Sequence, residues 1–184
     1  QVCGGLLRPV SLELGGKSAA IVLEDAKLEV LLQGLSAASL TSNGQACFSC
    51  TRILVPDSRY KEVVDGIAAT VAGYKVGDAL DRATQIGPLG SAVHRDRVEG
   101  YLAKGKTEGK LVAGGGRPKH LSRGWFVEPT VFADVDNNAV IAQEEIFGPV
   151  LSIIRYRGED EAVRIANASN YGLGGSVWSA DSAR

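Results

Sequence analysis

Two kinds of hydrophobic pattern alternate along this chain. Short apolar runs rich in β-branched residues, which are typical of buried strands, lie at residues 19–23, 52–55, 110–113, 150–154 and 175–178. Between these runs, apolar residues recur every three or four positions, as they do on one face of an amphipathic helix. This second pattern predicts helices at residues 25–39, 60–71, 92–102 and 160–168.

The alternation of strands with helices predicts an α/β fold with a mostly parallel sheet flanked by helices. The chain has 184 residues, which is about the length of one domain. It contains no internal repeat, low-complexity tract or linker, so we interpret residues 1–184 as a single domain. The mixed-charge stretch at residues 94–110 is interpreted as a solvated helix face.

The composition argues against several classes of partner. Twenty Lys and Arg residues stand against 21 Asp and Glu residues, a net charge of -1, which provides no electrostatic footprint for nucleic acid or an anionic membrane. Charged residues interrupt every apolar stretch, so we expect no membrane span. The 3 cysteines are too few for a secreted disulfide framework, and we therefore expect a cytoplasmic protein.

Two features indicate a piece of a longer protein. The sequence contains no methionine, so we do not expect Gln1 to be a translation start. Residues 179–184 have the composition of a helix start, and no helix follows them.

The glycine-rich turns do not match the known phosphate-binding motifs. The pattern G-x-G-x-x-G fails at Gly172 because Val177 occupies the third glycine position. The P-loop pattern fails near Gly16 because Ser11 stands where its first glycine is required.

Reactive groups are concentrated in three segments, and the first is residues 12–18. Glu13 lies in an apolar context beside Gly15 and Gly16, which let a ligand approach the backbone. Desolvation there would raise the pKa of the Glu13 carboxyl group and suit it to general base catalysis near neutral pH. The alternative is a structural carboxylate at a strand edge, bonded to Lys17 or to solvent.

The second segment, residues 42–52, contains two cysteines. Cys47 follows an Asn-Gly turn and precedes a stretch that could begin a helix. Exposed N–H groups at a helix N-terminus would stabilise the Cys47 thiolate and could also receive an oxyanion. Two alternatives stay open, namely a buried unreactive thiol and a redox or metal-binding pair formed with Cys50.

The third segment, residues 143–150, combines acidic and aromatic side chains. Glu144, Glu145 and Phe147 are followed by a Gly-Pro turn into a strand. We expect these side chains at an edge of the sheet, where open α/β folds bind ligands. The ring could stack on a planar ligand while a carboxylate accepts a sugar hydroxyl. A helix end with a packed phenylalanine is an equal alternative.

Taken together, the three segments resemble the NAD(P)-dependent aldehyde dehydrogenase superfamily. The stretches that carry the resemblance are LELGGKS at residues 12–18, GQAC at 44–47 with Arg52 beyond it, and EEIFGPV at 144–150. Residues 75–78, 86–89 and 170–173 are similar to the family as well, so the resemblance covers nearly the whole chain.

The resemblance implies a role for each site residue. Cys47 would be the nucleophile that adds to an aldehyde to give a thiohemiacetal, which becomes a thioester once hydride has passed to the nicotinamide. Glu13 would activate the water that hydrolyses the thioester to a free acid. Glu145 would bind the nicotinamide ribose, Phe147 would pack near the nicotinamide ring, and the backbone of Leu14 would lie near its carboxamide. The cofactor would be NAD or NADP, and the other partner a small aldehyde.

The chain also departs from the family. It has only about a third of the family's length, and it lacks the N-terminal cofactor domain and the C-terminal part of the catalytic domain. The resemblance therefore implies a fragment of the catalytic domain, from a parent enzyme that is a homodimer or homotetramer. We expect the parent to oxidise aldehydes and the fragment alone to lack that activity, and we expect its uncovered apolar surface to favour self-association.

Two further interpretations belong beside this one. The alternative to an enzyme is a catalytically inactive scaffold or relic that keeps the fold. Cys3 and Cys50 match no fixed functional position of the family, and both are interpreted as structural.

Overall fold

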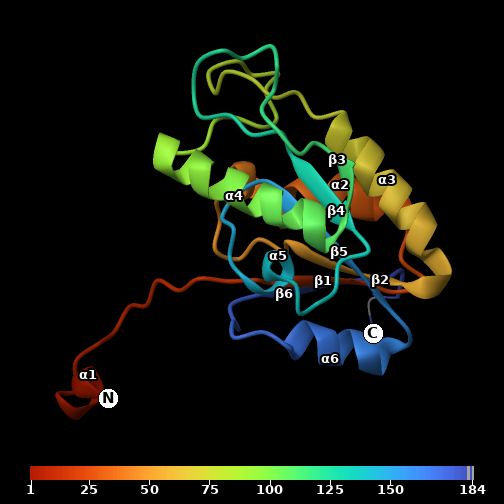
Figure 1. Cartoon of the computed structure of the whole chain (residues 1–184). Helices are drawn as coiled ribbons and strands as arrows, with labels where there is room; N and C mark the ends of the chain where they lie inside the picture. The colour runs from red at the N-terminus through yellow and green to blue at the C-terminus, as the bar shows by residue number, and fades with distance from the viewer. Residues whose placement is uncertain (182, 184) are drawn as a thin grey trace.

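A six-stranded sheet with the order β3-β4-β5-β2-β1-β6 forms the centre of the computed structural model, which describes residues 1–181 and 183 (Figure 1). The neighbouring strands run parallel except for the antiparallel pair β3 and β4. The predicted α/β fold with a mostly parallel sheet is therefore confirmed. The strands are β1 (Ala19–Val22), β2 (Arg52–Pro56), β3 (Lys110–Ala113), β4 (Thr130–Ala133), β5 (Val150–Tyr156) and β6 (Gly175–Trp178).

Helices cover both faces of this sheet. The α-helices are α1 (Val2–Gly5), α2 (Leu28–Ser39), α3 (Tyr60–Ala72), α4 (Ala92–Glu108), α5 (Val140–Gln143) and α6 (Glu159–Asn167). Two 3₁₀ turns precede the site and α3, namely η1 (Thr41–Gly44) and η2 (Asp57–Arg59).

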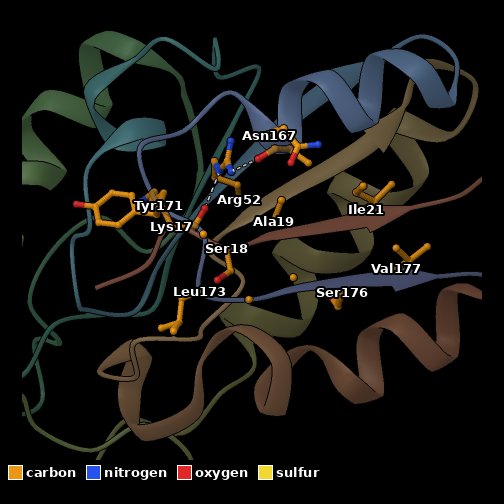
Figure 2. Close-up of a pocket in the computed structure, with 14 residues that line it drawn as sticks. Lys17, Ser18, Ala19, Ile21, Arg52, Asn167, Tyr171, Leu173, Ser176 and Val177 are labelled. Atoms are coloured by element: carbon orange, nitrogen blue, oxygen red, sulfur yellow. Dashed lines mark hydrogen bonds between the residues drawn. The ribbon is translucent and has the colours of Figure 1, made fainter. Parts of the chain in front are cut away.

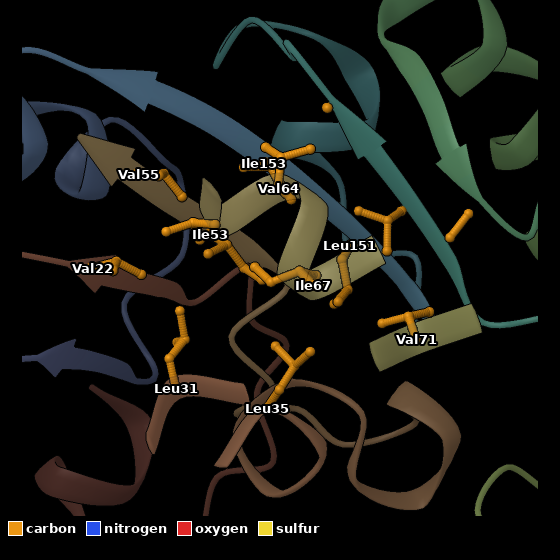
Figure 3. Packing of buried hydrophobic residues seen from close by; sticks show 14 of the residues in the cluster. Val22, Leu31, Leu35, Ile53, Val55, Val64, Ile67, Val71, Leu151 and Ile153 are labelled. Carbon is orange, nitrogen blue, oxygen red and sulfur yellow. The ribbon is translucent and has the colours of Figure 1, made fainter. Parts of the chain in front are cut away.

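The core consists of two apolar layers, one on each face of the sheet. Alternate residues of a strand point to opposite faces, so Ile53 packs in the layer under α2 and α3 while Leu54 packs in the layer under α4, α5 and α6. In Figure 3, Leu31 and Leu35 of α2 point toward the strand side chains of the first layer. Burial on both faces explains why most residues of β2 and β5 are apolar, without a regular alternation of apolar and polar residues.

Two of the differences between the predicted and the observed elements have local reasons. The first long helix begins at Leu28 rather than near Asp25, because the Asp25 carboxylate accepts hydrogen bonds from Ser179 and from the amides of Ala180 and Asp181. Strand β4 was not predicted, since its four residues directly follow Pro129 and are all buried, so they show no alternation. The helix start expected at residues 179–184 falls partly outside the described residues.

The N-terminal segment lies apart from the sheet. Residues 8–18 have no regular secondary structure, and they form an extended segment that leads from the short helix α1 to β1 (Figure 1). Residues 8–15 are exposed, whereas residues 16–20 are buried. Among the described residues, no helix is long and apolar enough to cross a membrane.

Candidate active site

The three segments singled out in the sequence meet at one edge of the sheet. Residues 15–18, 46–51 and 145–149 lead directly into β1, β2 and β5, which are parallel neighbours in the sheet. The amino ends of these strands therefore lie side by side. Open α/β sheets usually bind ligands at the carboxyl ends of their strands. The three segments do lie together at one end of the strands, as predicted, but it is the amino end, so the comparison with those sheets does not hold.

Cys47 lies in a turn, and no helix begins there. The chain leaves α2 through η1, turns at Cys47 and enters β2 at Arg52. The expectation that a helix N-terminus stabilises the Cys47 thiolate is therefore wrong, because the residues after the cysteine must cross directly to β2. Cys47 is half-buried with a free thiol, and among the described residues its amide donates no hydrogen bond.

The turn that carries Cys47 is held by Asn43. The Asn43 backbone has a φ of 63°, a left-handed conformation that asparagine tolerates better than most residues. Its side-chain amide donates to the carbonyl of Pro88 at 3.1 Å, and its side-chain oxygen accepts from the amide of Gly87 at 2.7 Å. These two bonds tie the turn to a loop that is distant in sequence.

Glycines bring the three segments into contact. A Cβ atom on Gly16 would collide with the carbonyl oxygen of Cys47, so only a glycine lets the chain before β1 approach the cysteine turn this closely. Gly44 has a φ of 74°, and a Cβ atom there would collide with the carbonyl of Gly148. The glycines of the first and second segments are therefore required by close backbone approach.

The Glu145 carboxylate points toward the first segment. Its Oε1 atom accepts a hydrogen bond from the Gly16 amide at 3.0 Å. Its Oε2 atom would lie 2.6 Å from a Cβ atom on Gly15, so this glycine leaves room for the carboxylate. Arg97 of α4 donates to the main-chain oxygen of Glu145 at 2.7 Å. One carboxylate oxygen is thus fixed by the main chain, and the second accepts no hydrogen bond among the described residues.

Phe147 presents its ring at the surface in a strained backbone conformation. The φ of Phe147 is 60°, and the residue is 37% exposed. The His94 ring contacts the Phe147 ring edge-on, with centroids 6.0 Å apart, and His94 Nε2 lies 2.6 Å from the Phe147 carbonyl oxygen. Left-handed backbone at a bulky residue costs energy and persists only where its surroundings hold it.

His94 and Arg97 were missed as site-supporting residues. We interpreted the stretch that contains them as a solvated helix face, and the structure corrects this for these two side chains. They stand three residues apart, which places both on the same face of α4. That spacing was the available signal, but nothing in the sequence identifies the loop that this face meets.

Glu13 and Leu14 are not brought to Cys47. Both are exposed, Leu14 at 56%, on the extended segment before Gly16. The expected desolvation of the Glu13 carboxylate is absent, because nothing packs over this part of the chain. The Glu13 side chain also makes no hydrogen bond or ion pair with Lys17 or with any other described residue.

Lys17 is a buried residue that the sequence pattern did not identify. It is 1% exposed, and its Nζ atom has no hydrogen-bond partner among the described residues. Burial, together with the nearby Arg52 charge, lowers the pKa of Lys17 to about 7, although the charges of Glu145 and Glu144 act in the opposite direction. An amine in these surroundings is readily deprotonated near neutral pH.

Arg52 is also buried, but unlike the Lys17 ammonium its guanidinium has hydrogen-bond partners (Figure 2). Its guanidinium donates to the carbonyls of Lys17 at 2.9 Å, Ile165 at 3.0 Å and Ala166 at 2.8 Å, and to the Asn137 side chain at 2.9 Å. Burial lowers the pKa of Arg52, but the carbonyls at the C-terminal end of α6 favour a cation there. Arg52 thereby ties the lead into β1 to α6.

Cys50 lies in the interior of the protein, unlike Cys47. Cys50 is buried, which raises the pKa of its thiol, while a hydrogen bond from Ser176 at 3.6 Å partly offsets that rise. All three cysteines are free thiols, so Cys47 and Cys50 form no disulfide in this structure. The described residues contain no group of three His, Cys, Asp or Glu side chains placed to hold a metal ion.

Comparison with known proteins gives the same family from sequence and from structure. The sequence model of the aldehyde dehydrogenase family matches residues 1–184. A geranial dehydrogenase of Castellaniella defragrans is 67% identical over 181 residues, and a betaine aldehyde dehydrogenase of Rhizobium etli is 46% identical over 182 residues. The crystal structure of a Mycobacterium tuberculosis aldehyde dehydrogenase complexed with NAD+ superimposes with a TM-score of 0.92 at 53% identity, over 97% of this chain.

These relatives are much longer than the chain. The matches cover 98% of this chain but only 38% of the geranial dehydrogenase and 37% of the betaine aldehyde dehydrogenase. The chain likewise covers 37% of the Mycobacterium tuberculosis structure. With its full length matched by the family model, and with the fold shared at high identity, this chain belongs to the aldehyde dehydrogenase family.

Proposed function

We propose that residues 1–184 form the central part of the catalytic domain of an enzyme that oxidises an aldehyde to a carboxylic acid with NAD or NADP. The observation that carries the proposal is the meeting of Gly16, Cys47 and Glu145 at the amino ends of three parallel strands. A thiol nucleophile, a backbone amide and an ionisable group for a cofactor sugar are thereby gathered in one place.

Cys47 is the proposed nucleophile. Its thiolate adds to the aldehyde carbon and forms a thiohemiacetal, which becomes a thioester on oxidation and is then hydrolysed. The free amide of Cys47 supports this role because it can donate a hydrogen bond to the oxyanion that develops on the carbonyl oxygen. Cys50 is a poor alternative because its thiol is buried.

Glu13 is the proposed general base for the hydrolysis. It activates the attacking water by accepting a proton, which requires its carboxylate to come within hydrogen-bond reach of a water at the thioester. Glu13 precedes Gly16 by three residues on an extended, exposed segment, so a modest change in that segment moves the carboxylate relative to Cys47.

The residues around Glu145 fit a nicotinamide cofactor. The Glu145 carboxylate keeps one oxygen free to accept a ribose hydroxyl while the other is fixed by Gly16. The exposed ring of Phe147 offers a planar apolar surface beside it, and the backbone of Leu14 lies on the same lead-in segment as Gly16. When bound, the nicotinamide supplies the acceptor for the hydride that leaves the substrate carbon.

We propose an apolar, unsaturated aldehyde of the geranial type as the substrate. The support is the identity of 67% with a geranial dehydrogenase, compared with 46% with a betaine aldehyde dehydrogenase. Betaine aldehyde carries a quaternary ammonium group, whose recognition typically requires aromatic or anionic contacts. The ratio of kcat/KM for geranial over betaine aldehyde measures this preference.

A chimera tests the proposed roles. The 184 residues replace the matching segment of the Castellaniella defragrans geranial dehydrogenase, and formation of NADH from geranial is followed. We expect Cys47→Ala to abolish NADH formation and Cys50→Ala, its matched control, to retain it. Glu13→Gln is expected to give a burst of about one NADH per active site and then little turnover, because the thioester accumulates. Unimpaired turnover in Cys47→Ala would exclude the proposal.

The isolated chain is proposed to lack turnover. Its described cofactor-facing groups are limited to the few around Glu145 and Phe147, which provide only part of the binding energy for a dinucleotide. We expect no sustained NADH formation from the purified 184-residue chain with geranial, whereas alkylation followed by peptide mass spectrometry is expected to label Cys47 faster than Cys50. Sustained NADH formation by the chain alone would contradict this expectation.

A further inference from the structure

Asn43 and Gly44, in the turn that leads to Cys47, form a chemically labile pair. Of the 5 asparagines in the chain, Asn43 is the one that a glycine follows. In such a pair the main-chain nitrogen of the glycine can attack the side-chain carbonyl carbon of the asparagine, because no side chain shields that nitrogen. Asparagine is accordingly a thermolabile residue in proteins. Whether this pair reacts depends on how the fold holds the two reacting groups.

The folded turn keeps the two reacting groups apart. Ring closure requires the Gly44 nitrogen to lie on the same side of the Asn43 Cα–C bond as the Asn43 side chain. The Asn43 backbone has a φ of 63° and a ψ of 33°, and in this left-handed conformation the Gly44 nitrogen lies nearly opposite the side chain. The main chain must therefore rotate before the two atoms can meet.

Hydrogen bonds hold both groups in this arrangement. The Gly44 amide donates to the carbonyl of Leu40 at 3.2 Å, so its proton is engaged. The Asn43 side chain is held at both ends, since its oxygen accepts from Gly87 and its nitrogen donates to Pro88. Gly44 is buried and Asn43 is half-buried, which restricts the access of water and of a base to the pair.

The closed turn is strained and depends on side-chain bonds. Ser42 and Asn43 both have a left-handed backbone, with φ of 51° and 63°, a conformation that costs free energy in residues with a side chain. Gln45 is a further tie, because its Oε1 atom accepts from the Gly90 amide at 3.0 Å and its Nε2 atom donates to the Ser42 carbonyl at 3.0 Å. Loss of these bonds therefore favours opening of the turn.

Modification of Asn43 disturbs the turn that carries Cys47. In aspartate, an oxygen replaces the Nδ2 donor and faces the Pro88 carbonyl, so two acceptors meet where a hydrogen bond was. In isoaspartate, the main chain gains one carbon atom before Gly44. That glycine has no room to move, because a Cβ atom on it would lie 2.2 Å from the Gly148 carbonyl oxygen. Cys47 follows in the same turn, so its position changes in either case.

We propose that Asn43 is a site of spontaneous deamidation, which the closed turn prevents and opening of the turn allows, and that the reaction displaces the Cys47 turn. The site does not depend on the proposed oxidation, because the reaction needs neither an aldehyde nor a cofactor. Water is its only co-reactant.

The reaction has two steps. The Gly44 nitrogen loses its proton and forms a bond to Cγ of Asn43, while the bond from Cγ to Nδ2 breaks, so that ammonia leaves and a cyclic succinimide remains. Water then breaks either of the two C–N bonds of the ring that involve this nitrogen, which leaves aspartate or isoaspartate at position 43. The net reaction takes up one water, releases one ammonia and changes no oxidation state.

Peptide mass spectrometry tests the proposal on the 184-residue chain. The chain is kept at pH 8, either folded or in denaturing guanidinium chloride, and replacement of the side-chain amide by a carboxylate is followed over time. We expect Asn43 to react faster in the denatured chain by about tenfold or more, which corresponds to an opening free energy of at least ~1.4 kcal/mol. Asn138, which precedes an alanine, is the internal control and is expected to react slowly in both states.

Gln45→Ala loosens the turn without changing the reacting pair. We expect this variant to speed deamidation of Asn43 in the folded chain by about threefold to tenfold, because the hydrogen bonds of the Gln45 side chain are lost. The rate in denaturant should stay the same. Gln33→Ala, which makes the same change at an exposed glutamine of α2, is the matched control and should alter neither rate.

Asn43→Asp tests the consequence for Cys47, because aspartate is one product of the reaction. We expect this variant to have a lower melting temperature and an alkylation rate of Cys47 that differs by about threefold or more from that of the unmodified chain. Asn138→Asp makes the same change at an exposed residue and should leave both quantities unchanged.

Equal rates at Asn43 in the folded and the denatured chain would overturn the proposal, and so would a rate in denaturant no higher than that of Asn138. An unchanged folded-state rate in Gln45→Ala would contradict gating by the turn, and unchanged alkylation in Asn43→Asp would contradict the effect on Cys47. If either variant fails to fold, the comparison of the folded with the denatured unmodified chain still decides.

Discussion

Lys17 illustrates how strongly a single side chain depends on the fold around it. In the sequence it stands with Ser18 after two glycines, and the only role that we considered for its side chain was as a partner for Glu13. In the structure its main chain is anchored by Arg52 and its ammonium is buried. The consequence is a titrating group whose pKa differs greatly between the folded and the unfolded chain.

The stability of the protein is therefore expected to depend on pH through Lys17. The folded-state pKa is about 7, against 10.5 for an unperturbed lysine. Below about pH 7 the amine is protonated in both states, and the folded state bears the full cost of a buried charge. As pH rises from 7 toward 10.5 the folded state releases the proton first, so the free energy of unfolding increases.

Comparison with Lys17→Met isolates this effect. We expect the variant to be the more stable protein at pH 6, by on the order of a few kcal/mol, and its advantage to shrink as pH rises to 9. Urea unfolding of both proteins at pH 6, 7, 8 and 9, without carboxylate buffers, measures the difference. Equal differences at every pH would show that the Lys17 pKa is not lowered.

Gly16 offers a second test at the scale of one residue. We expect Gly16→Ala to lower the free energy of unfolding by about 1–3 kcal/mol, because the added methyl group collides with the Cys47 carbonyl and forces the backbone to move. The alkylation rate of Cys47 should change as well, since its turn is displaced.

Gly100→Ala is the matched control for Gly16→Ala. Gly100 lies inside α4, and a Cβ atom there meets no other atom within 4 Å. The control should raise the free energy of unfolding by about 0.5–1 kcal/mol, because alanine favours a helix more than glycine does. Urea unfolding of both variants measures the two shifts, and a stable Gly16→Ala protein would show that the contact is looser than described.

The sequence was sufficient to single out some of the residues that the structure brings together, and insufficient for others. Cys47, Glu145 and Phe147 belong to contiguous motifs, and the structure brings their segments together with Gly16. The supporting role of His94 was not predictable, because it depends on a loop more than fifty residues away in sequence meeting one face of α4. The exposed position of Glu13 was not predictable either, since apolar neighbours in sequence do not guarantee burial.

At the scale of elements, helix α4 is the support on which the third site segment rests. Its first turn supplies His94 to the Phe147 carbonyl, and its second supplies Arg97 to the Glu145 carbonyl. The start of this helix is fixed by Ser91, whose Oγ accepts a hydrogen bond from the His94 amide at 3.1 Å. The same residue thus takes part in the helix cap and in the site contact.

Removal of this cap is expected to weaken both. We expect Ser91→Ala to lower the free energy of unfolding by about 1 kcal/mol, the usual value of a serine cap, and to broaden the NMR signals of residues 145–148. Ser91→Asp should preserve both properties, because aspartate caps a helix as well as serine does. A Ser91→Ala protein as stable as the unmodified one would contradict this role.

The four long helices and five of the six strands were predicted, whereas strand β4 and helix α5 were missed. The predicted strands at residues 110–113 and 175–178 have the same limits as β3 and β6. All four of these short elements have four residues, too few for a period of two or of 3.6 to stand out from chance. Their existence depends on tertiary burial between neighbouring elements.

At the scale of the whole molecule, the sheet ends in an uncovered edge at β6. Within the described part of the chain this strand pairs with β1 alone, and its residues alternate between exposed and half-buried, with Val177 at 58% exposure. Unpaired N–H and C=O groups along such a strand are a template for pairing with another chain. The apolar surface expected from the sequence analysis is therefore found here and along the exposed N-terminal segment.

This edge is expected to drive self-association of the isolated chain. We expect light scattering to show an average mass that rises with protein concentration, and Val177→Lys to reduce that rise because a lysine on an edge strand opposes pairing. Val163→Lys, at an exposed valine of α6 away from the edge, is the control and should have little effect. A monomer at every concentration would contradict the prediction. The homodimer or homotetramer expected for the longer enzyme is a different association, and this experiment does not test it.

The hydrogen bond between Gly16 and Glu145 has a consequence for how this protein tolerates mutation. The donor is a main-chain N–H group, which every amino acid except proline supplies. No single-base change in a glycine codon produces proline, so a point mutation at codon 16 cannot delete this donor chemically. Every such missense change does add a side chain, which meets the Cys47 carbonyl. A missense change at codon 16 is therefore expected to disturb the protein through the volume of the new side chain, while the main-chain donor to Glu145 is present whatever residue is encoded.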